Sequence, residues 1–186
     1  FGTTTQIDYR NFHMGSPLGP PNQIAAYWDD LIVSGVANGG VYLMDDAANG
    51  RVIIEWRVQC LWASGTAPQT FQGILYDPSG YPSPTGDGKI LVQYQDVNPH
   101  ANSISFDNDF ATVGIQNINH TSGLEICYWN AYTPGSTTLA DGRAIMFTTD
   151  ITGAIDPTFA LLSPNGGELW LQDSTVSILW APAQAA

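Results

Sequence analysis

Basic residues are scarce in this chain, and their scarcity excludes two classes of partner. Five Lys and Arg stand against 17 Asp and Glu, which gives a formal net charge of −12 at pH 7. Nucleic-acid binding depends on Lys and Arg side chains that neutralise phosphates, and anionic membranes attract the same residues. We therefore expect no nucleic-acid partner and no membrane insertion. The acidic balance fits a secreted protein, or one that takes up cations.

Long apolar runs are also missing. No run approaches the roughly 18 residues that span a bilayer. The first ten residues, FGTTTQIDYR, lack the basic and apolar regions of a signal peptide. Because the chain begins with Phe1 rather than methionine, we expect it to be a processed or excised piece of a longer protein. Its 186 residues suffice for one globular domain and a fragment of another.

Cysteine is nearly absent, with Cys60 and Cys127 as the two occurrences. Two cysteines in an exported protein favour a disulfide between them. A domain of this size folds without one, and a buried reduced cysteine packs as a small apolar residue. The sequence leaves both alternatives open.

Catalytic motifs are missing as well. The chain contains no H-E-x-x-H, C-x-x-C or G-x-S-x-G. Its three histidines, His13, His100 and His120, lie in turn-rich loops. The three residues of a Ser-His-Asp site need not be close in sequence, but no nucleophilic side chain here lies in a recognisable catalytic motif. We therefore expect this chain to be no enzyme by itself.

A period of two dominates the apolar residues that are present. In RVIIEWRVQC, residues 51–60, every second residue from Val52 to Cys60 is apolar, and Ile53 alone breaks the polar face. This alternation predicts a half-buried antiparallel strand. Further strands are predicted at 23–28, 40–44, 70–76, 88–96, 111–117, 124–130 and 143–149. Gly, Pro, Asn and Asp clusters separate many of them, so the fold class is all-β, an antiparallel β-sandwich.

The division into domains follows from a change in composition near residue 150. We expect residues 1–150 to form the sandwich module and residues 151–160, rich in Thr, Gly and Asp-Pro, to form a linker. Residues 161–186 then begin a second, incomplete module.

The order of the short motifs in the main module resembles a known family. The pieces IAAYWDDL, EW, FQGILY, GKILVQY and ATVGIQN follow one another between about residues 20 and 149. This combination is similar to the nidogen-like extracellular β-sandwich module of secreted bacterial proteins. The resemblance implies a fragment of an extracellular protein. It also implies further N-terminal strands, which this chain lacks or keeps only as FGTTTQIDYRNF.

The tail carries a second resemblance. SPNGGELW, followed by STVSILW, is similar to the start of an Ig-like module of the S-P-N-G-G-E-x-W type. Left in water, its apolar residues would form an exposed patch with unpaired strand edges. We expect residues 158–180 to pair as added strands, on their own sandwich edge or on a neighbouring copy. The residues expected to make this contact are Leu169, Trp170, Ile178 and Trp180.

Two candidate ligand sites arise from acidic and aromatic residues. Asp29 and Asp30, with Asp45, Asp46, Asp107 and Asp109 in other loops, suggest a calcium site built from carboxylates. The alternative is that these aspartates cap turns. Among the many aromatic residues, Trp62, Tyr81 and Tyr132 lie beside loop signals and are candidates for a carbohydrate-facing surface.

Two functions fit these features. The first is a non-catalytic extracellular or cell-surface module for adhesion, assembly or spacing within a larger secreted protein, with other protein modules as partners. The second is an accessory domain of a secreted hydrolase, a peptidase or glycosidase, whose catalytic unit lies outside this chain.

Overall fold

The fold was examined in a computed structural model, which describes residues 10–60, 68–97, 111–129 and 131–150, together with the backbone of 160–163 and 179–181. The chain divides into two compact units, residues 1–149 and 150–186. Within the described residues the regular structure is β-strand, apart from one turn of 3-10 helix at Ala47–Asn49. The predicted all-β class with antiparallel sheets is confirmed.

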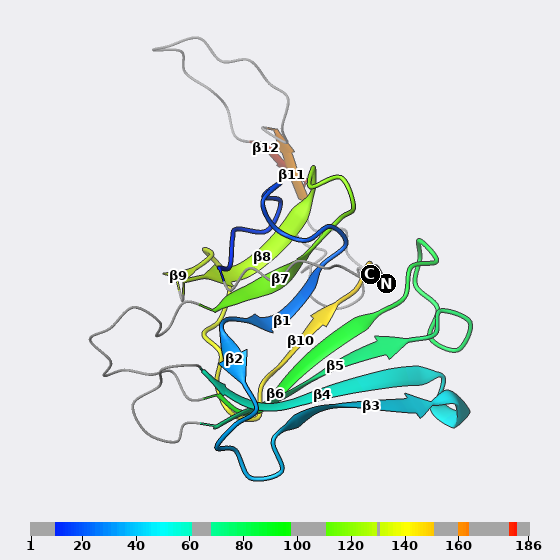
Figure 1. The fold of residues 1–186 in the computed structure, drawn as a ribbon. Coiled ribbons are helices and arrows are strands. Elements are labelled where there is room, and N and C mark those ends of the chain that lie inside the picture. The colour runs from blue at the N-terminus through cyan, green and yellow to red at the C-terminus, as the bar shows by residue number, and fades with distance from the viewer. Residues whose placement is uncertain are drawn as a thin grey trace. The chain divides into compact units, whose positions relative to one another are not determined.

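The first unit contains two antiparallel sheets (Figure 1). The four-stranded sheet has the order β1-β7-β8-β9, and the six-stranded sheet has the order β10-β6-β5-β4-β2, with β3 also paired to β4. The four-stranded sheet is built from β1 (Ile24–Trp28), β7 (Thr112–Gln116), β8 (Gly123–Tyr128) and β9 (Ala131–Tyr132). The six-stranded sheet is built from β2 (Leu31–Ile32), β3 (Gly40–Asp46), β4 (Arg51–Cys60), β5 (Pro68–Tyr76), β6 (Ile90–Asp96) and β10 (Ala144–Phe147).

The core lies where β1 and β7 cover β5 and β6. The rings of Tyr27 and Phe71 lie 5.6 Å apart, and Tyr94 Oη donates to the Ala26 carbonyl oxygen at 2.7 Å. Val92 is fully buried in the same core. These contacts join the two sheets into a sandwich.

The six-stranded sheet extends beyond this cover. Along one cross-strand row of its inner face, Phe71 is 2% exposed, Trp56 is half-buried and Val41 is 57% exposed. The next row ends at Leu43, which is 73% exposed. The inner face therefore opens towards β3. Trp56 lies at the margin of the core, stacked on Phe71 with 5.2 Å between ring centroids.

The second unit holds a two-stranded antiparallel sheet of β11 (Ala160–Ser163) and β12 (Leu179–Ala181). Leu161 lies opposite Trp180 in its register. Part of the predicted linker thus begins a strand at residue 160. Leu169, Trp170 and Ile178 lie outside the described residues, and the pairing of this segment with a sandwich edge stays a prediction.

Candidate functional site

The side chain of Asp29 accepts a hydrogen bond from the backbone of its own turn. Asp29 Oδ1 accepts a hydrogen bond from the Asp30 backbone N–H at 2.8 Å, and Cys60 Sγ donates to Asp29 Oδ2 at 3.6 Å. Asp46 accepts from Arg51 Nε at 2.7 Å and from Asn49 Nδ2 at 2.8 Å. The hydrogen bond from Arg51 is the main cause that lowers the pKa of the Asp46 carboxyl.

No cluster of three or more His, Cys, Asp or Glu side chains within metal-binding reach occurs in the part of the chain that the structure describes. Asp107 and Asp109 lie outside that part. Of the described aspartates, Asp29 caps its own turn, whereas Asp46 bonds to the side chains of Asn49 and Arg51 and makes no side-chain cap hydrogen bond. Both the calcium site and the turn-capping alternative stay predictions.

The two cysteines are not joined by a disulfide. Both are buried thiols, Cys60 at the end of β4 and Cys127 in β8 of the other sheet. The sequence left open a disulfide or two reduced cysteines, and the structure has two reduced cysteines. Burial is the main cause that raises the pKa of the Cys127 thiol to about 11, so this sulfur stays protonated and unreactive at neutral pH.

A thiol titration without reductant tests this arrangement. We expect two reactive thiols per chain in denaturant, and slow reaction in the native protein because both sulfurs are buried. A count below two in denaturant would show that a bridge or another modification occupies the cysteines.

The predicted ligand-facing aromatic residues have different surroundings. Tyr81 packs against Tyr76, with 4.6 Å between ring centroids. Tyr132 is half-buried, and its hydroxyl accepts from the Leu139 backbone N–H at 3.0 Å. Trp62 lies outside the described residues. The structure therefore does not bring Tyr81 and Tyr132 together as one exposed platform.

Trp129 is an exposed aromatic residue that the sequence did not single out. It follows β8 with a left-handed φ of 49°, which is unusual for a bulky residue. Its ring stacks on Tyr128, and its Nε1–H donates to Asn11 Oδ1 at 3.2 Å. His13, on the other side of this cluster, lies 3.1 Å from Glu125. The indole N–H of Trp129 and the imidazole Nδ1 of His13 are thus each already engaged in a hydrogen bond.

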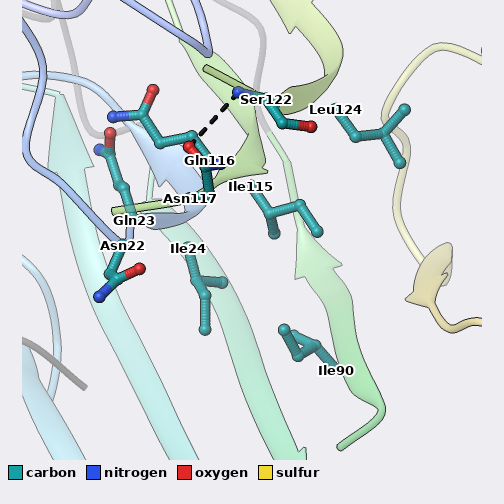
Figure 2. A pocket seen from close by; sticks show the side chains of 10 residues that line it. Asn22, Gln23, Ile24, Ile90, Ile115, Gln116, Asn117, Ser122 and Leu124 are labelled. Carbon is teal, nitrogen blue, oxygen red and sulfur yellow. Dashed lines mark hydrogen bonds between the residues drawn. The ribbon is translucent and has the colours of Figure 1, made fainter. Parts of the chain in front are cut away.

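The hollow in Figure 2 has an aliphatic floor and an amide rim. Its volume is about 570 Å³, and Ile24, Ile90 and Ile115 lie around a common space. On the rim, Asn117 Oδ1 accepts from the Ser122 backbone N–H at 3.3 Å. Its described lining consists of aliphatic, amide and hydroxyl side chains and one glycine. This lining offers apolar contact and hydrogen bonds, and it contributes no general acid or base.

Strand β3 combines a free edge with exposed apolar side chains. Among the described strands it pairs with β4 alone, and it forms the lower edge of the sheet in Figure 1. Residues 41–45 are all exposed, on both faces of the strand. Val41, Tyr42, Leu43 and Met44 are large and apolar. A long apolar edge strand of this kind is a template for pairing with another strand.

The helical segment among the described residues, Ala47–Asn49, is too short to cross a membrane. No protein family, curated protein or solved structure matches the chain.

Proposed function

We propose that this chain is a non-catalytic extracellular or cell-surface module for adhesion, assembly or spacing within a larger secreted protein, and that it self-associates by strand addition at β3. The observation that carries the proposal is the exposed edge of β3. Supporting it, the pieces of the nidogen-like motif fall on β1, β4, β5, β6 and β7, which form most of the sandwich.

Natural sheets usually protect their edges with Lys, Pro, bulges or short strands. β3 has seven residues without Lys or Pro, and its register with β4 runs without a bulge from Gly40 to Asp46. By contrast β10, the opposite edge, has four residues. Of these two edges of the six-stranded sheet, β3 is therefore the unprotected one among the described residues, and its backbone groups are available for an added strand.

The donor in this proposal is the tail of a neighbouring copy. Residues 158–180 are rich in Leu, Ile, Val and Trp, and β11 and β12 have β-strand backbones. An added strand would gain ladder hydrogen bonds and cover Val41 and Leu43, which lie on one face of β3. Such a contact runs head to tail and propagates as a filament unless it closes into a ring.

A charge on β3 is expected to block the assembly. In the full chain, Leu43→Lys places an ammonium on the added-strand interface, where pairing would desolvate it. Because Leu43 is 73% exposed, the free energy of unfolding should change by less than about 0.5 kcal/mol. Sedimentation velocity over rising concentration should show oligomers for the wild type and monomers for the variant. Met146→Lys, on the exposed face of β10, is the matched control and should still assemble.

Deleting residues 157–186 removes the proposed donor strands and keeps the acceptor strand β3. The sandwich should remain folded, because residues 1–149 form a compact unit, while the assembly should be lost. A shortened chain that still assembles would refute the tail as donor. A wild type that stays monomeric at high concentration would refute strand addition itself.

A further inference from the structure

The outer face of the six-stranded sheet carries a row of polar side chains in register. Tyr42 lies opposite Glu55, Glu55 opposite Gln72, and Gln72 opposite Gln93. The row crosses β3, β4, β5 and β6, which spans about 14 Å at the usual strand spacing. That length accommodates a short oligosaccharide.

Hydrogen bonds link three of the four side chains of this row to one another. Gln93 Nε2 donates to Gln72 Oε1 at 2.7 Å, and Gln72 Nε2 donates to Glu55 Oε2 at 2.5 Å. Arg57 Nε donates to Glu55 Oε1 at 2.6 Å. The hydrogen bond from Gln72 is the main cause that lowers the pKa of the Glu55 carboxyl, so this group remains an acceptor at neutral pH. A fixed row loses little conformational entropy when a ligand binds.

The row retains capacity for a ligand. A shallow hollow of about 210 Å³ lies over the part of the row on β4, β5 and β6, and Tyr42 lies outside its lining. It is lined by Glu55, Gln72 and Gln93, with Thr70, Gln95 and Arg143 beside them. Each amide nitrogen has two N–H groups, and each carbonyl oxygen has two lone pairs. Among the described contacts, Gln72 and Gln93 each use one of their two amide N–H groups as a donor, and Gln93 Oε1 accepts no hydrogen bond. Donors and acceptors therefore stand side by side in the hollow.

An aromatic ring at the β3 end of the row and an apolar row beside it add apolar surface to this face. Tyr42 is 46% exposed; its hydroxyl donates to the Asn38 carbonyl oxygen at 2.9 Å, and the Arg57 guanidinium lies 5.6 Å from its ring centroid. Next to the row, a second row on the same face is entirely apolar. It consists of Met44, Ile53, Ile74, Leu91 and Met146. The face thus offers a partly exposed tyrosine ring, with Arg57 over it, and apolar surface beside its hydrogen-bonding groups.

The charge of the row selects an uncharged ligand. Arg57, two residues from Glu55 on β4, forms an ion pair with it, so the carboxylate of the row is compensated. Arg143 at the margin of the hollow donates to the Thr138 carbonyl oxygen, while the chain as a whole carries −12 and repels polyanions. The faces of a sugar ring are apolar, and its hydroxyls both donate and accept hydrogen bonds. We propose that the outer face of the six-stranded sheet, centred on Tyr42, Glu55, Gln72 and Gln93, binds a neutral carbohydrate chain.

A peptide strand is a poorer fit to this face. Its affinity would come from backbone hydrogen bonds, and the interior strands β4, β5 and β6 already use theirs in the sheet. The cluster of His13, Tyr128 and Trp129 is a weaker carbohydrate candidate, because its polar groups satisfy one another. The carbohydrate site goes beyond the proposed assembly function. Both involve β3, but Tyr42 lies on the outer face of this strand and Leu43 points to the opposite face.

Affinity gel electrophoresis of the full chain tests the site. Gels contain xylan, mannan or β-glucan as neutral polysaccharides, and pectin or heparin as anionic ones. We expect at least one neutral polysaccharide to retard the wild type and neither anionic one to do so. Tyr42→Ala and Gln72→Ala should each weaken the binding at least tenfold. Leu43→Lys should bind as the wild type does, even where it no longer assembles.

Trp129→Ala is the matched control, since it removes an exposed aromatic ring from the other sheet, and it should retain binding. A thermal melt of each variant verifies the fold, and Gln93→Ala replaces Gln72→Ala if the latter unfolds. The proposal is overturned if no neutral polysaccharide retards the wild type, or if only the anionic ones do. It is also overturned if Tyr42→Ala and the glutamine variant both retain full affinity, or if the loss appears in Trp129→Ala instead.

Discussion

Replacing Phe71 with alanine is expected to lower the free energy of unfolding by about 4 kcal/mol. Phe71 is 2% exposed, and its ring contacts those of Tyr27, Trp56 and Tyr94, with centroid distances of 5.6, 5.2 and 6.3 Å. Truncation removes the buried ring and leaves a cavity between the two sheets that rigid aromatic neighbours cannot close. A small domain is stable by only about 5–15 kcal/mol, so a large part of its stability would be lost.

Urea denaturation followed by tryptophan fluorescence measures this loss, and the melting temperature should fall by roughly 10 °C. Val41→Ala is the control from the same cross-strand row. Because Val41 is more than half exposed, its truncation should cost less than about 0.5 kcal/mol. Equal losses for the two variants would show that the inner face near β3 is covered, contrary to the structure.

Long stretches of alternating apolar and polar residues predicted their strands well. β4 has the bounds predicted from its period of two, and β5 and β6 coincide closely with the strands predicted at 70–76 and 88–96. β2 and β9 were missed because a segment of two residues carries no period. β11 lies within residues 158–180, which were expected to form strands, but its bounds could not be predicted because Leu161 and Leu162 are adjacent, without alternation.

The depth of burial could not be predicted from the same pattern. Alternation assigns Val52, Ile54 and Trp56 to the inner face, yet all three are only half-buried. Their burial depends on how far the four-stranded sheet extends over the six-stranded one, which is a relation between segments far apart in the sequence. The exposed edge of β3 has the same origin.

The candidate carbohydrate row was also hidden from the sequence. Gln72 and Gln93 are 21 residues apart and become neighbours only through the β5–β6 register. Trp129 was hidden for a different reason. The alternation extended the predicted strand to residue 130, but β8 ends at Tyr128, and the left-handed φ of the next residue turns the indole outwards.

Replacing Gly114 with alanine is expected to destabilise the sandwich by about 3 kcal/mol. Gly114 lies in β7 opposite Glu125, at an irregularity in the β7–β8 register. A Cβ atom here would lie 2.3 Å from the Leu124 carbonyl oxygen and 2.6 Å from Met14 Cγ. The methionine side chain can move away, but the carbonyl oxygen belongs to the paired strand, so β7 and β8 must separate locally. Alanine also restricts the unfolded chain, which offsets the loss by about 0.4–1 kcal/mol.

Gly80→Ala is the control for this substitution. The nearest atom to its added Cβ is the Asp77 carbonyl oxygen at 3.9 Å, an ordinary contact, and Gly80 has no positive φ. Its free energy of unfolding should therefore stay the same or rise slightly, through the unfolded-state effect alone. Chemical denaturation of both variants, followed by the same fluorescence signal, separates the steric cost from that effect. If Gly114→Ala proves as stable as Gly80→Ala, the strand pairing at this irregularity must differ from the one described, because no alanine fits against a backbone oxygen at 2.3 Å.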